Sequence, residues 1–358
     1  MLSHLPNELV QRIIELSIPP CSVDSRSTYW RRQGALRTYC LVSRRLRDLA
    51  QPLLFAVVEL TRPQQVGALL SGLRGTGLGT AIKTLHLYQD RSGHSFESDK
   101  VERLLAEATS LKELALSTGQ TELNLSSLAN HAELERLILS LDDFIVREPF
   151  MLPGLVELSI FESVAPPQHF ATLLSSSTLP GLQALAVHNC ELYDALFRPA
   201  PLGIPCTLLS QLDMVSLSAI DTDTLPVDPA QTSVPILLDV NLDPSRNSAP
   251  MFQRSNVRLV VDLEVDGLDE LLDALELYLT ANATILRLLY LPRLFGDLVT
   301  YSPVQARRLQ TILETHLPEV VEVVYEDTPY VTPRSVSLSS LISPDFWARA
   351  RAMKAEAE

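Results

Sequence analysis

The sequence predicts an α/β protein in which a short helical module is followed by a long array of parallel strands. Two observations lead to this fold class. The first sixty residues contain amphipathic helical segments, and ten copies of the spacing L-x-x-L-x-L follow in order, about 26 residues apart on average. A chain of 358 residues with 46% hydrophobic and 20% charged residues can bury an extensive core.

The first helix is expected where Leu5, Leu9, Ile13 and Leu16 recur at helical spacing and form one apolar stripe. Pro6 falls in its first turn, where the missing N–H costs nothing because that donor has no intrahelical acceptor. Two consecutive prolines then end the helix.

A second, strongly basic helix is expected over residues 29–50, with Pro52 ending it and a short extended run over 54–58. Residues 1–60 hold 8 Lys+Arg and 5 Asp+Glu, a net charge of +3, whereas the rest of the chain carries −17. This asymmetry indicates two parts with different partners. The total of −14 argues against non-specific nucleic-acid binding, which needs basic residues to neutralise phosphates.

The basic helix and the stripe before it carry a recognisable motif. Its residues are Leu5-Pro6, Leu9, Ile13, Cys40-Leu41-Val42-Ser43-Arg44-Arg45-Leu46-Arg47, Leu49-Ala50 and Pro52-Leu53-Leu54-Phe55. The motif resembles an F-box of the fungal type, a three-helix module that opens many ubiquitin-ligase receptors, and it covers about 55 residues. Two features depart from the family pattern: the segment Pro19–Gly34 is longer than the usual link, and Leu46 stands where many members carry Trp.

The resemblance implies a partner. An F-box docks on an acidic Skp-family adaptor, which connects to a cullin and a RING subunit. The implied adaptor-binding residues are Leu5, Pro6, Leu9, Ile13, Leu41, Val42 and Leu46. The alternatives are that these residues are only the core of a helical cap on the repeats, or that the Arg cluster is a nuclear import signal or a membrane-surface patch.

Residues 61–342 are expected to form the repeat array, with a parallel sheet on the concave face of a solenoid and helical or irregular returns. The triplets are Ile82-Leu85-Leu87, Leu111-Leu114-Leu116, Leu134-Leu137-Leu139, Leu155-Leu158-Ile160, Leu182-Leu185-Val187, Leu209-Leu212-Met214, Leu237-Val240-Leu242, Val260-Leu263-Val265, Leu286-Leu289-Leu291 and Val320-Val323-Tyr325. Helical returns are expected at 101–108, 268–279 and 309–313. The array resembles the irregular leucine-rich repeats found behind F-boxes.

Other segments punctuate the array. A Gly-rich turn over 72–79 is expected to join the helical module to the first repeat, and Pro-rich stretches over 199–205, 226–235 and 244–250 are expected to form looser returns. Residues 343–358 are expected to form a C-terminal capping helix and tail, with Ser343 as the N-cap.

One candidate surface for a target protein is an acidic pair of predicted strands. Its residues are Asp239, Asn241, Asp243, Asp262, Glu264 and Asp266. Such a cluster suits a Lys/Arg-rich target segment, or it is an ordinary solvated face. No metal-loop spacing accompanies it, so no metal site is expected. A second contact region combines His86, Tyr88, Phe161 and His188.

The sequence contains no G-x-S-x-G, G-x-G-x-x-G, Walker A or H-E-x-x-H motif, so neither catalysis nor a cofactor is expected. Four scattered cysteines, no signal peptide and no transmembrane run predict an intracellular protein of the cytoplasm or nucleus, without membrane contact. The function expected from the resemblance is that of a substrate receptor in an SCF-type ubiquitin ligase. The alternative is a leucine-rich-repeat scaffold that binds a protein without ubiquitin transfer.

Overall fold

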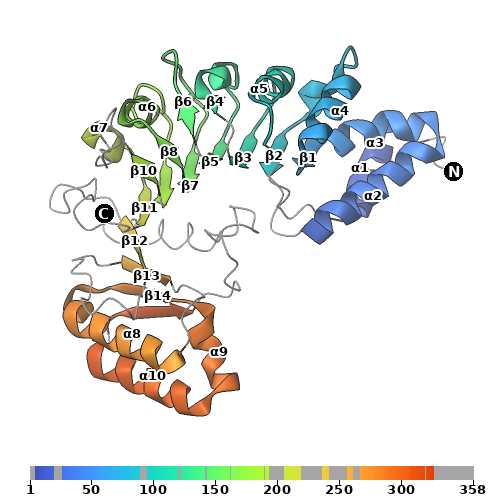
Figure 1. Cartoon of the computed structure of the whole chain (residues 1–358). Coiled ribbons are helices and arrows are strands. Elements are labelled where there is room, and N and C mark those ends of the chain that lie inside the picture. Colours follow the sequence, from blue (N-terminus) through green and yellow to red (C-terminus); the bar gives the residue numbers. More distant parts are fainter. Residues whose placement is uncertain are drawn as a thin grey trace. The chain divides into compact units, whose positions relative to one another are not determined.

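The computed structural model divides the chain into two compact units, the first ending at Leu182 and the second beginning at Gln183. The described residues are 5–19, 26–88, 95–119, 122–141, 143–161, 163–188, 190–192, 205–218, 236–241, 256–260, 267–318 and 320–325. Both units combine helices with parallel strands, which confirms the predicted α/β class (Figure 1). No helix among these residues is both long and apolar enough to cross a membrane.

Unit 1 begins with three helices, α1 (Asn7–Ser17), α2 (Arg26–Val42) and α3 (Arg44–Ala56). The prediction of one helix over 29–50 is wrong, because the chain breaks at Ser43. Its hydroxyl accepts a hydrogen bond from the Leu46 amide at 3.2 Å and so caps α3.

The prediction that Pro52 ends the second helix is also wrong, since it lies inside α3. A proline in a helix removes one hydrogen bond, but Leu49, Leu53 and Leu54 around it pack against the core of the module and hold the helix. The expected extended run starts later as a result, at β1 (Val57–Leu60).

The three helices enclose a small core made of Val10, Ile14, Ile18, Leu36 and Ala50, all nearly or fully inaccessible to water. Val10 and Ile14 lie four residues apart in α1 and form its buried face, and Ile18 follows directly after the helix. The module is therefore packed from within before any partner binds.

Polar contacts attach the helical module to the start of the sheet. The buried Gln33 side chain donates hydrogen bonds to the carbonyls of Leu54 at 3.2 Å and Val57 at 3.1 Å. The amide of Glu59 donates to the Tyr29 hydroxyl at 3.1 Å. The predicted module of residues 1–60 is thus part of unit 1.

The main sheet of unit 1 has the order β1-β2-β3-β5-β7, with each strand parallel to the next. The further strands are β2 (Thr84–Tyr88), β3 (Glu113–Gly119), β5 (Arg136–Leu141), β7 (Glu157–Phe161), the short pair β4 (Leu123–Asn124) and β6 (Phe144–Ile145), and β8 (Val164–Ala165). The helical segments between them are α4 (Pro63–Leu73), η2 (Leu78–Ala81), α5 (Ser98–Glu107), η3 (Leu125–Asn130) and α6 (Pro167–Leu173).

The first four triplets lie where the sequence predicts. In each, the second and third apolar residues occupy a strand, and the register aligns Leu85, Leu114, Leu137 and Leu158 across four strands. These side chains are fully buried. The helices α4 and α5 lie along one side of the sheet (Figure 1). Every second residue of these strands thus contributes an apolar side chain to the core.

A repeated backbone contact sets the register of this sheet. The carbonyl of Lys83 accepts from the amides of Lys112 at 2.8 Å and Glu113 at 3.0 Å. The carbonyl of Lys112 accepts in the same way from Glu135 and Arg136, at 2.8 and 3.0 Å. Each turn into a strand is therefore hydrogen-bonded directly to the turn before it.

Two glycines allow successive turns to approach closely. A Cβ at Gly154 would lie 2.4 Å from the carbonyl oxygen of Ala132, and a Cβ at Gly181 would lie 2.8 Å from that of Pro153. Each glycine immediately precedes the first leucine of a triplet, and each oxygen belongs to the preceding turn. A side chain at either position would push two turns apart.

Near these turns, His131 is 2% exposed and neither ring nitrogen has a hydrogen-bond partner. Burial lowers the pKa of this imidazole, because its charged form loses contact with water. We expect His131→Leu to raise the free energy of unfolding by about 1 kcal/mol at pH 7.5, because it removes two unsatisfied polar atoms.

The same variant should respond less to acid. A histidine with a lowered folded pKa loses stability as the pH falls through its unfolded value of about 6.5, because the unfolded chain then binds an extra proton. Urea unfolding at pH 7.5 and 5.5 measures this, and the gain over the wild type should be larger at pH 5.5. An equal gain at both pH values would contradict the prediction.

Unit 2 has the strand order β9-β11-β12-β13-β14-β15, again with parallel neighbours. Its strands are β9 (Ala184–His188), β10 (Glu191–Leu192), β11 (Met214–Ser218), β12 (Ile236–Asn241), β13 (Asn256–Val260), β14 (Leu288–Leu291) and β15 (Glu322–Tyr325). Its helical segments are α7 (Cys206–Leu209), α8 (Leu268–Asn282), η6 (Ala283–Ile285), α9 (Arg293–Tyr301) and α10 (Pro303–His316).

Three predicted triplets of unit 2 are out of register. Val215 of β11 lies opposite Leu185, so the sixth triplet starts at Leu212 and not at Leu209. The seventh slips as well, since Ile236 lies opposite Val215. In the eighth, Val257 and not Leu263 lies opposite Leu289 of the ninth triplet, so the strand lies six residues earlier than predicted. In the fifth, ninth and tenth triplets the second and third apolar residues lie in a strand as predicted, and Leu289 of the ninth lies opposite Val323 of the tenth.

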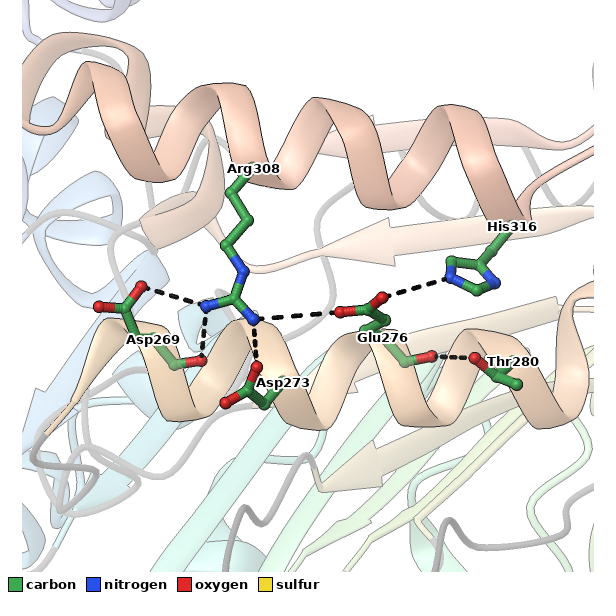
Figure 2. A network of polar contacts seen from close by, with 6 residues as sticks. All are labelled: Asp269, Asp273, Glu276, Thr280, Arg308 and His316. Atoms are coloured by element: carbon green, nitrogen blue, oxygen red, sulfur yellow. Dashed lines mark hydrogen bonds and ion pairs between the residues drawn. The ribbon is translucent and has the colours of Figure 1, made fainter.

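The predicted helices at 268–279 and 309–313 are present as α8 and α10, and a polar network joins them (Figure 2). Arg308 contacts Asp269 at 3.2 Å, Asp273, and Glu276 at 4.0 Å. His316 approaches Glu276 at 3.7 Å. The hydrogen bond to Asp273 is the main reason that the pKa of Arg308 is raised.

We expect Arg308→Met to lower the free energy of unfolding by about 0.5–1 kcal/mol, since these groups are partly exposed and water screens them. The loss should shrink in 1 M NaCl, as salt screens the attraction. Arg307→Met on the same helix is the control, because Arg307 is exposed and makes none of these contacts. Chemical denaturation with and without salt measures both variants, and equal effects would contradict the network.

Several predictions fall outside the described residues. They are the capping helix and tail at 343–358, the Pro-rich stretches at 226–235 and 244–250, and most of the stretch at 199–205. The Gly-rich turn joins α4 to η2 and not the helical module to the first repeat, with Gly75 and Gly77 at positive φ.

Candidate functional site: an exposed apolar surface on the helical module

The first helix carries apolar side chains on two faces. One face is the buried row in the core. The other holds Leu9, Ile13 and Leu16, which are 53%, 43% and 72% exposed. This second face contains most of the stripe that the sequence singles out. Since the core does not use it, the apolar stripe is available to a partner.

The end of α2 adds two more apolar side chains. Leu41 is 81% exposed and Val42 is 65% exposed, in the last turn before the break at Ser43. The break itself is braced, because Arg47 donates a hydrogen bond to the carbonyl of Cys40 at 3.1 Å. These two residues therefore project from a fixed corner.

Arg45 ties the beginning of α1 to this corner. Its guanidinium donates to the side-chain oxygen of Asn7 at 2.9 Å and to the carbonyl of Leu5. At the other end of α1, the hydroxyls of Ser17 and Tyr39 lie 2.7 Å apart. Both contacts join α1 to the residues on either side of the α2–α3 break. We call Leu9, Ile13, Leu16, Leu41 and Val42 the docking surface.

The remaining predicted adaptor residues have other positions. Leu5 and Leu46 are partly buried and pack against the core of the module, so they support the docking surface from behind. Pro6 precedes the first turn of α1 as its N-cap.

Sequence reasoning missed one exposed aromatic. Trp30 is 49% exposed, and its ring meets that of Tyr29 edge-on with centroids 5.3 Å apart. It lies in the first half of α2, inside the long segment that departs from the family pattern. A signal was present: tryptophan is enriched at interfaces, and this one follows a tyrosine in a basic run.

Basic residues are exposed on the same helical module as the docking surface. Arg31, Arg37, Arg44 and Arg47 are exposed on α2 and α3. Arg12 on α1 pairs with Glu15 at 3.2 Å. Exposed arginines on the module that carries the apolar residues suit an acidic partner, which they would attract over a distance of about 10 Å.

The predicted acidic surface does not have a second acidic strand beside β12 in the described residues. Asp239 and Asn241 lie on β12, where the register places Arg258 and Val260 opposite them. Asp243, Asp262, Glu264 and Asp266 lie outside the described residues. The expectation of two neighbouring acidic strands depended on a strand at 260–265, and the strand is at Asn256–Val260.

Carboxylates do gather elsewhere in unit 2, on α8, but the chain already supplies their cation. Asp269, Asp273 and Glu276 converge on Arg308 (Figure 2). The second predicted contact region has a similar internal pairing, since His86 contacts Glu113 at 2.9 Å. Among the described residues, no group of three or more His, Cys, Asp and Glu side chains is placed to hold a metal ion.

The sequence matches no protein-family model, and no curated protein matches it either.

Proposed function

We propose that this chain is a substrate-receptor subunit of an SCF-type ubiquitin ligase. In this proposal the helical module docks a Skp-family adaptor, and the repeat array, as a solenoid, binds a target protein. The observation that supports it best is the docking surface, because five large apolar side chains are exposed on a module whose core is already filled.

The physical case rests on burial and charge. Covering five apolar side chains at about 25 cal/mol per Å² contributes several kcal/mol, which is enough for a stable complex when a rigid module presents them together. The exposed arginines of the module favour an acidic adaptor of the kind that F-boxes bind. The helices would lie in a groove of that partner.

The chain itself would perform no chemistry. The adaptor and the cullin–RING subunits would hold the transfer enzyme, and the repeats would hold the target near it. The gain is the effective concentration of the target, which can reach millimolar when both are tethered in one complex. Loss of function would therefore follow from lost binding or lost stability.

The second candidate function is that of a leucine-rich-repeat scaffold whose helical module caps the first strand. The contacts of Gln33 and Tyr29 with β1 favour it, because a cap must be attached to the sheet in this way. A cap alone, however, has no use for the exposed apolar face of α1.

Co-purification of the full chain with a recombinant Skp-type adaptor separates the two candidates. The test variant is Leu41→Asp/Val42→Asp. The matched control is Val304→Asp/Val320→Asp, which places two carboxylates at equally exposed apolar positions of unit 2. Circular dichroism confirms that each variant folds.

The proposal expects a stable wild-type complex, an unchanged control, and a test variant that binds at least about 100-fold more weakly, because two carboxylates would be desolvated against apolar groups. Absence of a wild-type complex at micromolar concentration would overturn it in favour of the scaffold. Equal binding by the test variant and the wild type would show that the adaptor uses another surface.

A further inference from the structure

The helix α2 has an outer face that the core of the module does not use. A line of exposed residues runs along this face, with its members three or four positions apart: Trp30, Gly34, Arg37 and Leu41. Trp30 and Leu41, at the two ends, are 49% and 81% exposed. At 1.5 Å per residue the line is about 16 Å long, so it suits a partner segment and not only a single side chain.

Gly34 occupies the middle of this line. A glycine inside a helix is less favourable than alanine, because it loses more backbone freedom on folding. Nothing in the described chain requires a glycine there, since its φ is not positive and an added Cβ would meet no atom within 4 Å. Two large apolar side chains therefore flank a notch that is open to a partner.

The charge of α2 has a single sign. Its 17 residues include four arginines and neither Asp nor Glu. Arg31 and Arg37 are exposed, and neither is paired with a carboxylate in the part of the chain that the structure describes. A partner that covers α2 must therefore bring carboxylates of its own.

The notch favours a helix over a lipid surface as the occupant. Two helices pack most closely where a glycine lets their backbones approach each other. A lipid surface is soft and broad, and it gains from every apolar side chain that reaches it, so a glycine at the centre would only weaken that contact. The glycine between Trp30 and Leu41 thus suits a rigid, rounded partner.

We propose that a helix of an acidic partner crosses α2 at Gly34, between Trp30 and Leu41. Carboxylates of that helix pair with Arg31 and Arg37. The adaptor of the proposed function supplies the helix, so this contact rests on that function. The contact extends the docking surface from the end of α2 into its first half, where Trp30 is the anchor, because a half-exposed tryptophan gains much from being covered.

Gly34→Gln tests the crossing in the full-length protein, and Gly67→Gln in α4 is the matched control. An added Cβ meets no atom within 4 Å at either glycine, so both variants should be as stable to denaturant as the wild type or more so. None of the exposed large apolar side chains lies on α4. Calorimetric titration with a recombinant Skp-type adaptor should show at least about tenfold weaker binding for Gly34→Gln, which holds the partner helix away, and no change for Gly67→Gln.

Two further pairs of variants separate the apolar anchor from the charge. Trp30→Ala should weaken the complex at least about tenfold, whereas Tyr301→Ala, which removes an even more exposed aromatic ring from α9, should leave it unchanged. Arg37→Gln should lower the association rate and its dependence on salt, and Arg307→Gln should alter neither. Circular dichroism confirms that each variant folds.

Three results would overturn the contact along α2. If Leu41→Asp/Val42→Asp weakens the wild-type complex while Gly34→Gln and Trp30→Ala leave it unchanged, the contact is wrong and the proposed function stands. Absence of any wild-type complex would overturn both. Sedimentation with vesicles of phosphatidylcholine and phosphatidylserine gives the third: binding that Trp30→Ala weakens and Gly34→Gln does not would assign this face to a lipid surface.

Discussion

Replacing Gly154 with alanine is expected to lower the free energy of unfolding by about 2–3 kcal/mol. The added Cβ would lie 2.4 Å from the carbonyl oxygen of Ala132, a distance that real Cβ atoms essentially never reach. That oxygen belongs to the backbone of the preceding turn, which is hydrogen-bonded into the register of the sheet. The turns must therefore separate, and thermal or chemical unfolding measures the loss.

Gly67→Ala is the matched control. Gly67 lies in α4, and a Cβ added there would have no neighbouring atom within 4 Å, so alanine should raise helix stability by up to about 1 kcal/mol. Opposite signs for the two substitutions are expected. If Gly154→Ala is also neutral or stabilising, the close stacking of the turns is wrong.

The second large effect separates the two faces of α1. Ile14→Ala should cost about 2–4 kcal/mol of stability, because Ile14 is 1% exposed and fills the core of the module. Ile13→Ala, one residue away and 43% exposed, should change stability by less than about 0.5 kcal/mol. Denaturant unfolding of both variants provides the comparison.

Adaptor binding should give the opposite order. Under conditions where both variants are folded, Ile13→Ala should weaken the complex by roughly tenfold, and Ile14→Ala should weaken it less. The pair thus distinguishes a docking face from a structural face of the same helix. Equal losses of binding would mean that the adaptor senses only the stability of the module.

Much of the fold follows from the period of apolar residues. In seven triplets the second and third apolar residues occupy a strand as predicted, and nearly all of these positions carry leucine, isoleucine or valine. The three that slip, near Leu212, Ile236 and Val257, lie where apolar residues occur in runs and two phases fit equally well. There the register is set by pairing with the neighbouring strand. The spacing of apolar residues along a single strand carries no information about that pairing.

The candidate site is predictable from the sequence in its residues and not in its geometry. The sequence reveals the apolar stripe of Leu9 and Ile13. It does not distinguish this stripe from the equally apolar face that carries Val10 and Ile14. Which of two adjacent apolar faces points inward depends on Leu36 and Ala50, which come from other helices. The break between α2 and α3 depends on the hydroxyl of Ser43, which accepts the Leu46 amide and so begins a new helix. The spacing of apolar residues does not reveal such a local hydrogen bond.

The paired hydrogen bonds at Lys83 and Lys112 also bear on how such a chain can diverge. Each strand takes its alignment from the turn directly before it, so the segment that returns from one strand to the next carries no information about register. Insertions or deletions in those returns should leave the sheet intact, whereas a single inserted residue between a turn and its strand would shift every side chain to the opposite face. The segments that connect one strand of unit 1 to the next are thus free to vary in length, whereas the strands themselves are not.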